Sequence, residues 1–485
     1  MNRRWITVGM MIALAAGMAL SQGAKVGGEA RQLAMGAGTS SLGVAVNPFI
    51  TQDPVFILIN PAYQSYYGSY VWWNIGGGGL VNSNFIEDGY GKQNVGVSFN
   101  LSRDLVIGGI FSYDPSAVNV VSGLLKGGTA LTGLPFAFPA FIPAGLRAPA
   151  IGTEAAINGG QTIPGVANVW EVLAAYKTGT LDFGFGVTYG RSNSDATISN
   201  PGTSYSREAS SSMFGVRAGI LMDFGGGSNF DGHAAIRFDK ATDNVKFNPV
   251  VATQGGEYSV SGTEIEVGAR LKLRVSNRFN FVPYGSFTSV SATPKEDAPR
   301  NTIAAIKTTE TSTTTALAFG AGGEYKLSTF YLAGGLSFQM LRAKVEVTNP
   351  AAGAAPASSS TMTNSFTSVP TINLGAEWWL TDWLAARGGY YRAIGNVNSK
   401  LETSAGTAGS SSETNLTFPE SFILLGGLNP ATWDGVVTLG LGLRFGNFSL
   451  DGTISDEALR RGLGLLGSAD NINTFGYLTA SYNFE

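Results

Sequence analysis

The chain of 485 residues contains no cysteine, and only 13% of its residues are charged. The absence of cysteine excludes a disulfide framework and any metal site built from thiolates. The net charge is only −3 and both signs are mixed, so the basic face that a nucleic-acid partner needs is missing. One histidine, His233, is too little for the acid–base chemistry of a hydrolase. We therefore predict no enzymatic activity, no cofactor, no metal site and no nucleic-acid partner.

Long apolar runs are also missing, except at the N-terminus. Arg3 and Arg4 precede the apolar residues 6–20, and small residues follow them. This layout is typical of a secretory signal peptide, which we assign to residues 1–23. The alternative is a retained N-terminal anchor. No later run could span a membrane as a helix, so any membrane location requires strands with one apolar face.

Glycine and aromatic residues are abundant, with 66 glycines and 11% aromatics, and this composition favours strands over helical bundles. Residues 181–190 alternate between large apolar side chains and small or polar ones, and residues 214–224 do the same. A period of two over this length is typical of a tilted membrane strand. We expect Val216 to face lipid and Arg217 to face the lumen.

Short and long connections alternate along the chain, as periplasmic turns and extracellular loops do in outer-membrane barrels. The short turns are predicted at residues 102–104, 178–180, 276–278 and 445–447. The long connections are predicted at residues 114–168, 191–210, 292–312, 348–369, 397–433 and 456–472. Two Ser-, Thr- and Ala-rich segments within them, Ala351 to Thr363 and Thr403 to Thr417, are expected to be mobile at the outer rim.

These patterns predict an all-β fold, a transmembrane antiparallel up-and-down β-barrel of about 14–16 strands over residues 66–485. We expect it in the bacterial outer membrane, in contact with outer-membrane lipids. The last predicted strand is amphipathic and ends in the aromatic Phe484, followed by Glu485. Such an ending resembles the signal that barrel-assembly machinery recognises, which makes that machinery an expected partner.

The region before the first strand carries a further motif. It contains Met35-Gly36-Ala37, then Asp53, and then Asn60-Pro61-Ala62. This order resembles the N-terminal signature of the FadL-type outer-membrane transporter superfamily, which includes related barrel proteins of type IX secretion. The resemblance implies that residues 24–65 form a hatch inside the barrel lumen. It assigns hatch or gate roles to Met35, Gly36, Asp53, Asn60, Pro61 and Ala62. The alternative is an N-terminal tail in the periplasm.

The resemblance also implies a function, the passage of hydrophobic small molecules such as long-chain fatty acids by passive diffusion. Hydrophobic small molecules would then be the partners. Two alternatives stay open, a barrel that docks secreted or surface proteins and a general porin.

Two further groups of residues are candidates for a site. The strand pattern places Glu264, Glu266, Arg270 and Arg274 on one lumen-facing side, and their mixed signs favour structural salt bridges. A clamp on a ligand carboxylate by Arg270 or Arg274 is the alternative.

The second group lies in the apolar loop 124–146, because exposed apolar surface needs a use. In it, we expect Leu134, Phe136, Phe138 and Phe141 to capture substrate. The alternative is a cap that packs into the barrel mouth.

Overall fold

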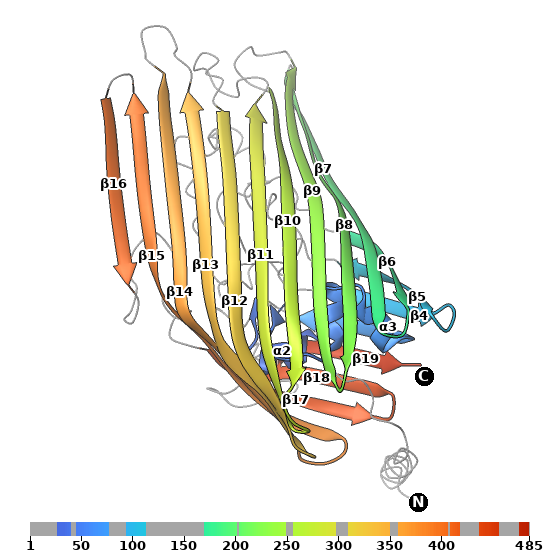
Figure 1. Cartoon of the computed structure of the whole chain (residues 1–485). Helices are drawn as coiled ribbons and strands as arrows, with labels where there is room; N and C mark the ends of the chain where they lie inside the picture. Colours follow the sequence, from blue (N-terminus) through green and yellow to red (C-terminus); the bar gives the residue numbers. More distant parts are fainter. Residues whose placement is uncertain are drawn as a thin grey trace, which may run out of the picture.

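Alternating side chains along most of the chain build one antiparallel sheet that closes on itself (Figure 1). The computed structural model describes residues 27–39, 45–76, 94–112, 169–200, 203–248, 256–296, 309–349, 357–405, 408–417, 436–454 and 475–484. The predicted signal peptide, residues 1–23, lies outside them. The predicted all-β barrel is confirmed.

The barrel strands run antiparallel from β3 to β19 around the sheet. They are β3 (Tyr70–Gly76), β4 (Asn94–Asn100), β5 (Leu105–Ser112), β6 (Val169–Lys177), β7 (Leu181–Asn200), β8 (Thr203–Gly225), β9 (Ser228–Asn248), β10 (Gly256–Arg274), β11 (Phe279–Glu296), β12 (Thr309–Lys326), β13 (Phe330–Asn349), β14 (Ser358–Trp379), β15 (Leu384–Ala405), β16 (Ala408–Thr417), β17 (Val436–Phe445), β18 (Phe448–Ile454) and β19 (Phe475–Asn483).

Two of these strands share one place in the barrel. β15 pairs with β16 through residues 396–405 and with β17 through residues 384–391. The described residues therefore form a barrel of sixteen strand positions, which agrees with the predicted range. The barrel closes where the last strand meets the first, with Leu478 of β19 opposite Ile75 of β3.

All four predicted short turns are present between consecutive strands. They connect β4 to β5, β6 to β7, β10 to β11 and β17 to β18. The C-terminal end of β19 lies at the same end of the barrel as these turns (Figure 1). In outer-membrane barrels this end faces the periplasm.

The strands differ in length around the barrel. β7 to β15 contain 18 to 23 residues each, whereas β3 to β6 and β17 to β19 contain 7 to 10. A membrane-spanning strand needs about 9–11 residues. The long strands, which we call the tall wall, therefore extend well beyond the bilayer at the end opposite the short turns (Figure 1).

Much of the predicted loop sequence belongs to this extension, so those loop predictions are wrong. Strand occupies residues 191–200 and 203–210, 292–296 and 309–312, 348–349 and 358–369, and 397–405 and 408–417. Beyond the bilayer the outward face need not be apolar, so the alternating signal disappears while backbone pairing continues. Hydroxyl pairs join neighbouring strands there, with Oγ atoms 2.8 Å apart at Ser210 and Thr242 and 2.7 Å apart at Thr403 and Ser410. Parts of both Ser- and Thr-rich segments are strand, and their mobility stays a prediction.

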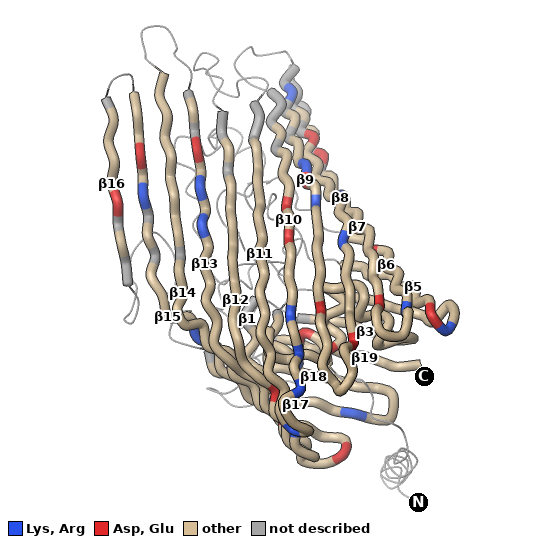
Figure 2. The backbone as a smooth tube through the Cα atoms, viewed as in Figure 1, with Lys and Arg blue, Asp and Glu red and all other residues tan. Residues whose placement is uncertain are grey.

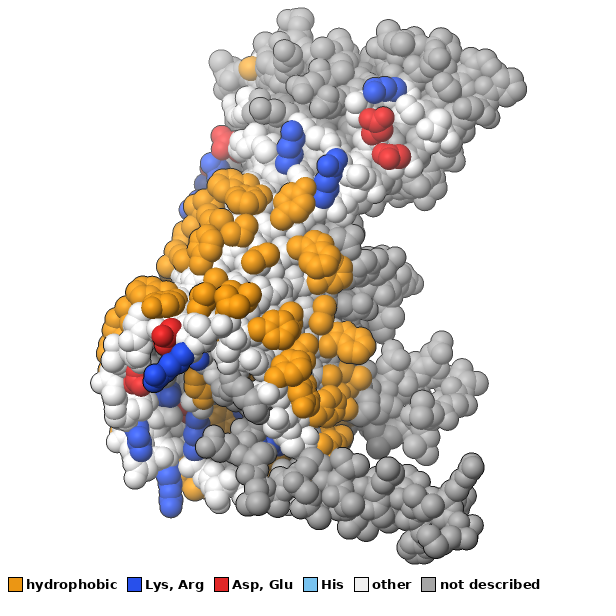
Figure 3. Space-filling view, turned by 90° about the vertical axis from the view of Figure 1, so that its right-hand side faces the viewer, with side chains coloured by type: hydrophobic (Ala, Val, Ile, Leu, Met, Phe, Trp, Pro, Cys, Tyr) orange, Lys and Arg blue, Asp and Glu red, His pale blue; other side chains and the backbone are white. Residues whose placement is uncertain are grey.

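The alternation places apolar side chains outward, as predicted. On β8, Phe214 is exposed while Arg217 is buried, and on β10 Ile265 is exposed while Glu264 is buried. Figure 3 shows hydrophobic side chains gathered at mid-height on one face of the barrel, with charged side chains above and below them. A closed antiparallel barrel with such an apolar band is a bacterial outer-membrane protein.

In the described part of the chain, no helix has the length and apolar character needed to cross a membrane.

The described residues before β3 lie inside the lower part of the barrel (Figure 1). They form α2 (Glu29–Ala34), β1 (Gly38–Thr39), β2 (Ala45–Val46), η1 (Pro54–Leu58) and α3 (Tyr63–Tyr67). We call residues 27–39 and 45–67 the plug. A large buried apolar cluster joins residues 55–67 to side chains of β3, β5 and β6. A smaller one joins Phe49 and Ile50 to β11 and β13.

Candidate functional site

Glycines on the inward face of the wall make room for the plug. At Gly375 a methyl group would lie 2.5 Å from the carbonyl oxygen of Met35. At Gly184 and Gly389 it would overlap the plug backbone at Ala62 and Gly36. Because backbone atoms cannot yield as a flexible side chain does, these positions require glycine. The part of the wall that contacts the plug is called the plug seat below.

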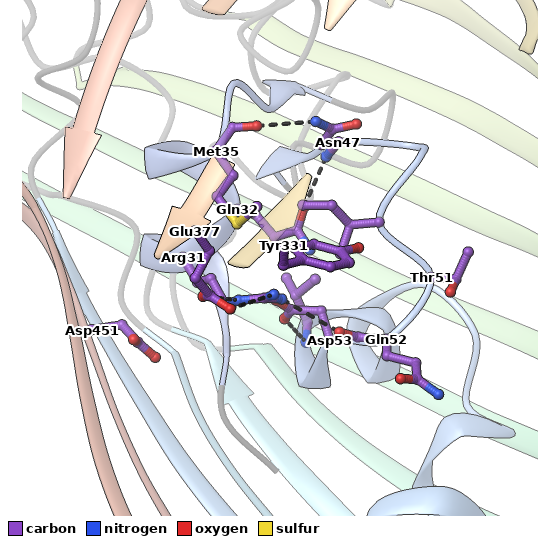
Figure 4. A network of polar contacts seen from close by, with 12 residues as sticks. Arg31, Gln32, Met35, Asn47, Thr51, Gln52, Asp53, Tyr331, Glu377 and Asp451 are labelled. Atoms are coloured by element: carbon purple, nitrogen blue, oxygen red, sulfur yellow. Dashed lines mark hydrogen bonds and ion pairs between the residues drawn. The ribbon is translucent and has the colours of Figure 1, made fainter. Parts of the chain in front are cut away.

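A buried ionic network holds the N-terminal half of the plug (Figure 4). The Arg31 guanidinium of α2 donates from Nε to Glu377 Oε2 of β14 at 2.8 Å and from Nη1 to Asp53 Oδ2 at 2.9 Å. Arg387 of β15 contacts the same Glu377 oxygen at 2.6 Å and Asp451 of β18 at 2.5 Å. All five side chains are buried. The network therefore joins two segments of the plug to three strands of the wall.

Asp53 also has a local role. Its side chain accepts a hydrogen bond from the backbone N–H of Val55 at 3.0 Å and so caps η1. Burial raises the pKa of the Asp53 carboxyl to about 6, although Arg31 acts in the opposite direction. The neighbouring Asp451 carboxyl raises the pKa of Asp53 as well, but burial is the largest cause.

A second buried contact fixes the other half of the plug. Arg270 of β10 donates to Asp231 Oδ2 of β9 at 2.7 Å, to the carbonyl oxygen of Ile50 at 2.6 Å and to the Tyr63 hydroxyl at 2.8 Å. Burial raises the pKa of the Tyr63 phenol, so Tyr63 is neutral and donates to Asp231 at 2.9 Å. Asn60 Nδ2 donates to the other Asp231 oxygen at 2.6 Å.

A third contact lies on β12. Glu324 Oε1 accepts hydrogen bonds from the backbone N–H of Thr51 at 2.7 Å and from its hydroxyl at 2.8 Å. Tyr331 donates to the same oxygen at 2.7 Å, and Asn280 donates to Oε2 at 3.0 Å. The plug is thus attached to the wall in at least three directions.

The structure places all six predicted hatch residues in the plug. Met35 is buried and accepts a hydrogen bond from Asn47 at 3.0 Å, and Gly36 has a φ of +68° where it approaches β14 and β15. Asp53 and Asn60 make the contacts described above. Pro61 and Ala62 lie against Gly184 of β7. Their role in gating stays a prediction.

The predicted lumen charges separate into different environments. Arg270 belongs to the plug contact, whereas Glu264 and Glu266 lie farther along β10 from the turn at residues 276–278. Figure 2 shows where acidic and basic residues occur along β10. Arg274 is exposed beside a turn, where it donates to the carbonyl oxygen of Gly226 at 3.2 Å and to Asn277 at 2.7 Å. The predicted capture residues Leu134, Phe136, Phe138 and Phe141 lie outside the described residues.

Above the plug, three carboxylates gather on β9 and β10. We call Asp239, Glu264 and Glu266 the carboxylate cluster. Arg237 Nη1 donates to Glu264 Oε2 at 2.9 Å and its Nη2 lies 4.0 Å from Glu266 Oε2. His233 Nε2 lies 3.3 Å from the other oxygen of Glu266. In the described part of the chain, no group of three His, Asp or Glu residues is arranged to hold a metal ion.

Sequence reasoning missed the partners of several charges. Glu171 of β6 pairs with Arg217, whose Nη2 lies 2.7 Å from its Oε2. Asp231 and Asp451 also escaped notice. The period of two could have placed all three carboxylates on the lumen face, but only the strand register shows which guanidinium each one meets.

Comparison with known proteins yields neither a matching family model nor a matching curated protein. Among solved structures, the ferric yersiniabactin uptake receptor FyuA from Yersinia pestis is similar at 10% identity and a TM-score of 0.32, over 86% of this chain and 80% of that chain. The ferric citrate transporter FecA is similar at 7% identity and a TM-score of 0.31, over 85% and 78%. The copper transporter OprC has 10% identity and a TM-score of 0.30, over 81% and 74%. Likeness at this level transfers no ligand and no mechanism to this chain.

The predicted relation to FadL-type transporters is wrong. The similar structures are receptors and transporters for iron complexes and copper by their descriptions. The short motif that suggested the family has local explanations, since Gly36 permits a close approach, Asp53 caps η1 and Asn60 binds Asp231.

The functional expectations that rested on that relation are wrong as well. Passive diffusion of long-chain fatty acids and hydrophobic partners find no support in these structures. The described lumen wall above the plug instead carries buried charges, which oppose the passage of an acyl chain. Neither the docking scaffold nor the general porin is favoured by the comparisons.

Proposed function

We propose that the chain takes up a specific polar solute across the outer membrane through a barrel that the plug closes at rest. The observation that carries the proposal is the buried network around Arg31, which attaches α2 to β14, and through Glu377 and Arg387 to β15 and β18. Such a seat fixes the plug in one position. No chemical reaction is assigned to the chain.

The ion pairs between the plug and the wall are compatible with release of the plug from its seat. Separating a buried ion pair costs Coulomb energy, but hydration of both charges returns much of that cost. Ionic contacts therefore specify a position without making release prohibitive. The N-terminal half of the plug has such a contact at Arg31, hydrogen bonds from Thr51 to Glu324, and a small apolar cluster at Phe49 and Ile50.

The C-terminal half of the plug adds a larger apolar cluster to its polar contacts at Asn60 and Tyr63. Its apolar cluster includes Val55, Phe56 and Tyr67 and continues into Trp72 of β3 and Leu173 of β6. Moving this half would expose buried apolar surface at about 25 cal/mol per Å². In our proposal the N-terminal half moves while residues 55–67 stay in place, and solute in the lumen shifts this equilibrium because it binds the released state more tightly.

Conductance in planar bilayers tests the proposal. The wild type should show a small conductance, and a deletion of residues 27–62 should show a large and steady one. The deletion variant should still insert, because the strands supply their own hydrogen bonds and lipid-facing surface. Arg31→Gln should give intermittent openings. A matched control is Glu402→Gln, which breaks the exposed pair with Lys400 on β15 and should behave as the wild type.

Equal conductance of the deletion variant and the wild type would overturn the proposal. Heat-modifiable gel mobility shows in each case that the variant is a folded barrel.

A further inference from the structure

Four buried carboxylate oxygens of the carboxylate cluster have no hydrogen-bond partner. They are both oxygens of Asp239, Oε1 of Glu264 and Oε2 of Glu266. The relative exposure of these residues is 5%, 1% and 3%. Buried carboxylates are ordinarily paired, because an unpaired one loses its hydration without compensation.

The neighbours of Asp239 cannot supply a partner. On the lumen face of β10 the residue opposite Asp239 is Gly262, which has no side chain. On β8 the residue opposite is Met213, which is buried and offers no N–H or O–H donor from its side chain. Arg237, two residues away on the same face, already donates to Glu264. None of these three neighbours therefore offers Asp239 a hydrogen-bond donor.

The charge balance of this part of the lumen is negative. Among the side chains that the structure describes on the inward faces of β6, β8, β9 and β10 above the plug, the guanidinium groups of Arg217 and Arg237 face four carboxylates. Those carboxylates are Glu171, Asp239, Glu264 and Glu266. Arg217 pairs with Glu171 through Nε and Nη2, while its Nη1 has no hydrogen-bond partner, so Arg237 is the main described cation for the other three. A sequence selected only for stability would place apolar or paired residues here, so the excess charge points to a ligand.

We propose that the carboxylate cluster binds an organic cation that carries several N–H donors, such as a guanidinium or primary ammonium group. The inference rests on the proposed function, since this cation would be the polar solute that enters the barrel. A guanidinium offers five N–H donors and an ammonium three, which suit four free acceptor oxygens. The absence of a metal-ligand arrangement among the described residues favours this class over a metal ion.

Calorimetric titration of the full chain in detergent micelles tests the site. The probe is agmatine, a dication with a guanidinium and a primary ammonium, and the comparison is hexamethonium, a dication without N–H groups. Agmatine should bind saturably to the wild type, and Asp239→Asn should weaken it at least tenfold, or about 1.4 kcal/mol. Glu402→Gln, the exposed control, should leave the affinity unchanged.

Three results would overturn the proposal. One is equal affinity of agmatine for Asp239→Asn and the wild type, and another is equal binding of agmatine and hexamethonium. The third is saturable binding of calcium chloride at the same residues with no binding of agmatine, which would assign the cluster to a metal ion.

Thermal stability separates a binding role from a structural one. Asp239 has no partner to lose, so Asp239→Asn removes a buried unpaired charge and should leave the unfolding midpoint unchanged or raise it. A binding site thus predicts weaker affinity together with undiminished stability. A lowered midpoint would show that Asp239 serves the fold, and would contradict the inference.

The outcome is separable from that of the proposed function. If the plug deletion opens the barrel but agmatine does not bind, the plugged uptake barrel stands and the cation site fails. If agmatine binds but the deletion leaves conductance unchanged, the site stands and the uptake proposal fails.

Discussion

The plug seat and the carboxylate cluster lie in the same lumen but differ in how their buried carboxylates are paired. Around Arg31, each carboxylate has a guanidinium within 2.9 Å, although Oδ2 of Asp451 and Nη2 of Arg387 have no hydrogen-bond partner. Around Arg237, Asp239 has no hydrogen-bond partner at all. The glycines also differ, since those of the seat contact plug backbone, whereas Gly262 lies opposite an unpaired carboxylate.

This difference teaches how to separate structure from function in a charged lumen. Charge that is paired on both sides holds two parts of one chain together, and its removal should damage the fold. Charge that is left unpaired costs stability and is explained by something outside the chain. The effects of substitutions on the stability of the barrel should therefore differ between the two regions in sign as well as in size.

The largest effect is expected for Glu377→Gln in the plug seat. The change leaves the buried guanidinium groups of Arg31 and Arg387 without their shared partner, which should cost about 3–5 kcal/mol. The midpoint of heat-modifiable gel mobility measures the loss. Glu346→Gln, which breaks an exposed pair with Lys344, is the control and should change stability by less than about 0.5 kcal/mol. Equal midpoints for the two variants would contradict the prediction that the buried pair of the plug seat contributes more stability than the exposed pair.

An intermediate effect is expected for Gly389→Ala on β15. Its methyl group would overlap the plug backbone at Gly36, and such overpacking costs typically about 1–3 kcal/mol. The adjacent Gly388 is the control, because a methyl group there meets the first side-chain atom only at 3.6 Å, on Leu439. Gly389→Ala should increase channel openings in bilayers and Gly388→Ala should not. Openings in both variants, or in neither, would mean that plug position does not depend on this approach.

The smallest effect is the pH dependence of plug release. The pKa of Asp53 is about 6 with the plug in place, above the ordinary value of 3.8, so the seated plug binds the proton more tightly than a released and hydrated one. Lowering the pH from 7.5 through 6 should therefore favour the seated state and reduce openings. Asp53→Asn should flatten this dependence. Openings that become more frequent at low pH would contradict the predicted direction of the pH dependence.

The period of two in the sequence predicted which residues face the lumen. It placed Glu264, Glu266 and Arg270 inward on β10, and the structure agrees. It could not predict that Arg31 meets a residue 346 positions away, because that contact depends on closure of the whole barrel. Nor could it predict that Asp239 faces Gly262, because register across two strands decides this.

The upper ends of the tall wall show a second limit of sequence reasoning. Within the bilayer, lipid imposes an apolar outward face and the pattern is easy to read. At residues 191–200 and 358–369 that constraint is absent, and Ser- and Thr-rich strand resembles a loop by composition. Strand pairing there depends on backbone hydrogen bonds, which the side-chain pattern does not report.

The seam between β19 and β3 has a consequence for assembly. The plug directly precedes β3, and Ala30 donates to Thr479 of β19, a partner 449 residues away. β3 gains its neighbour β19 only when the two ends of the barrel sheet meet, and the contact between Ala30 and Thr479 lies at the same seam. Contacts of such long range close slowly, so we expect the seating of α2 and the closure of the wall to occur together, late in folding.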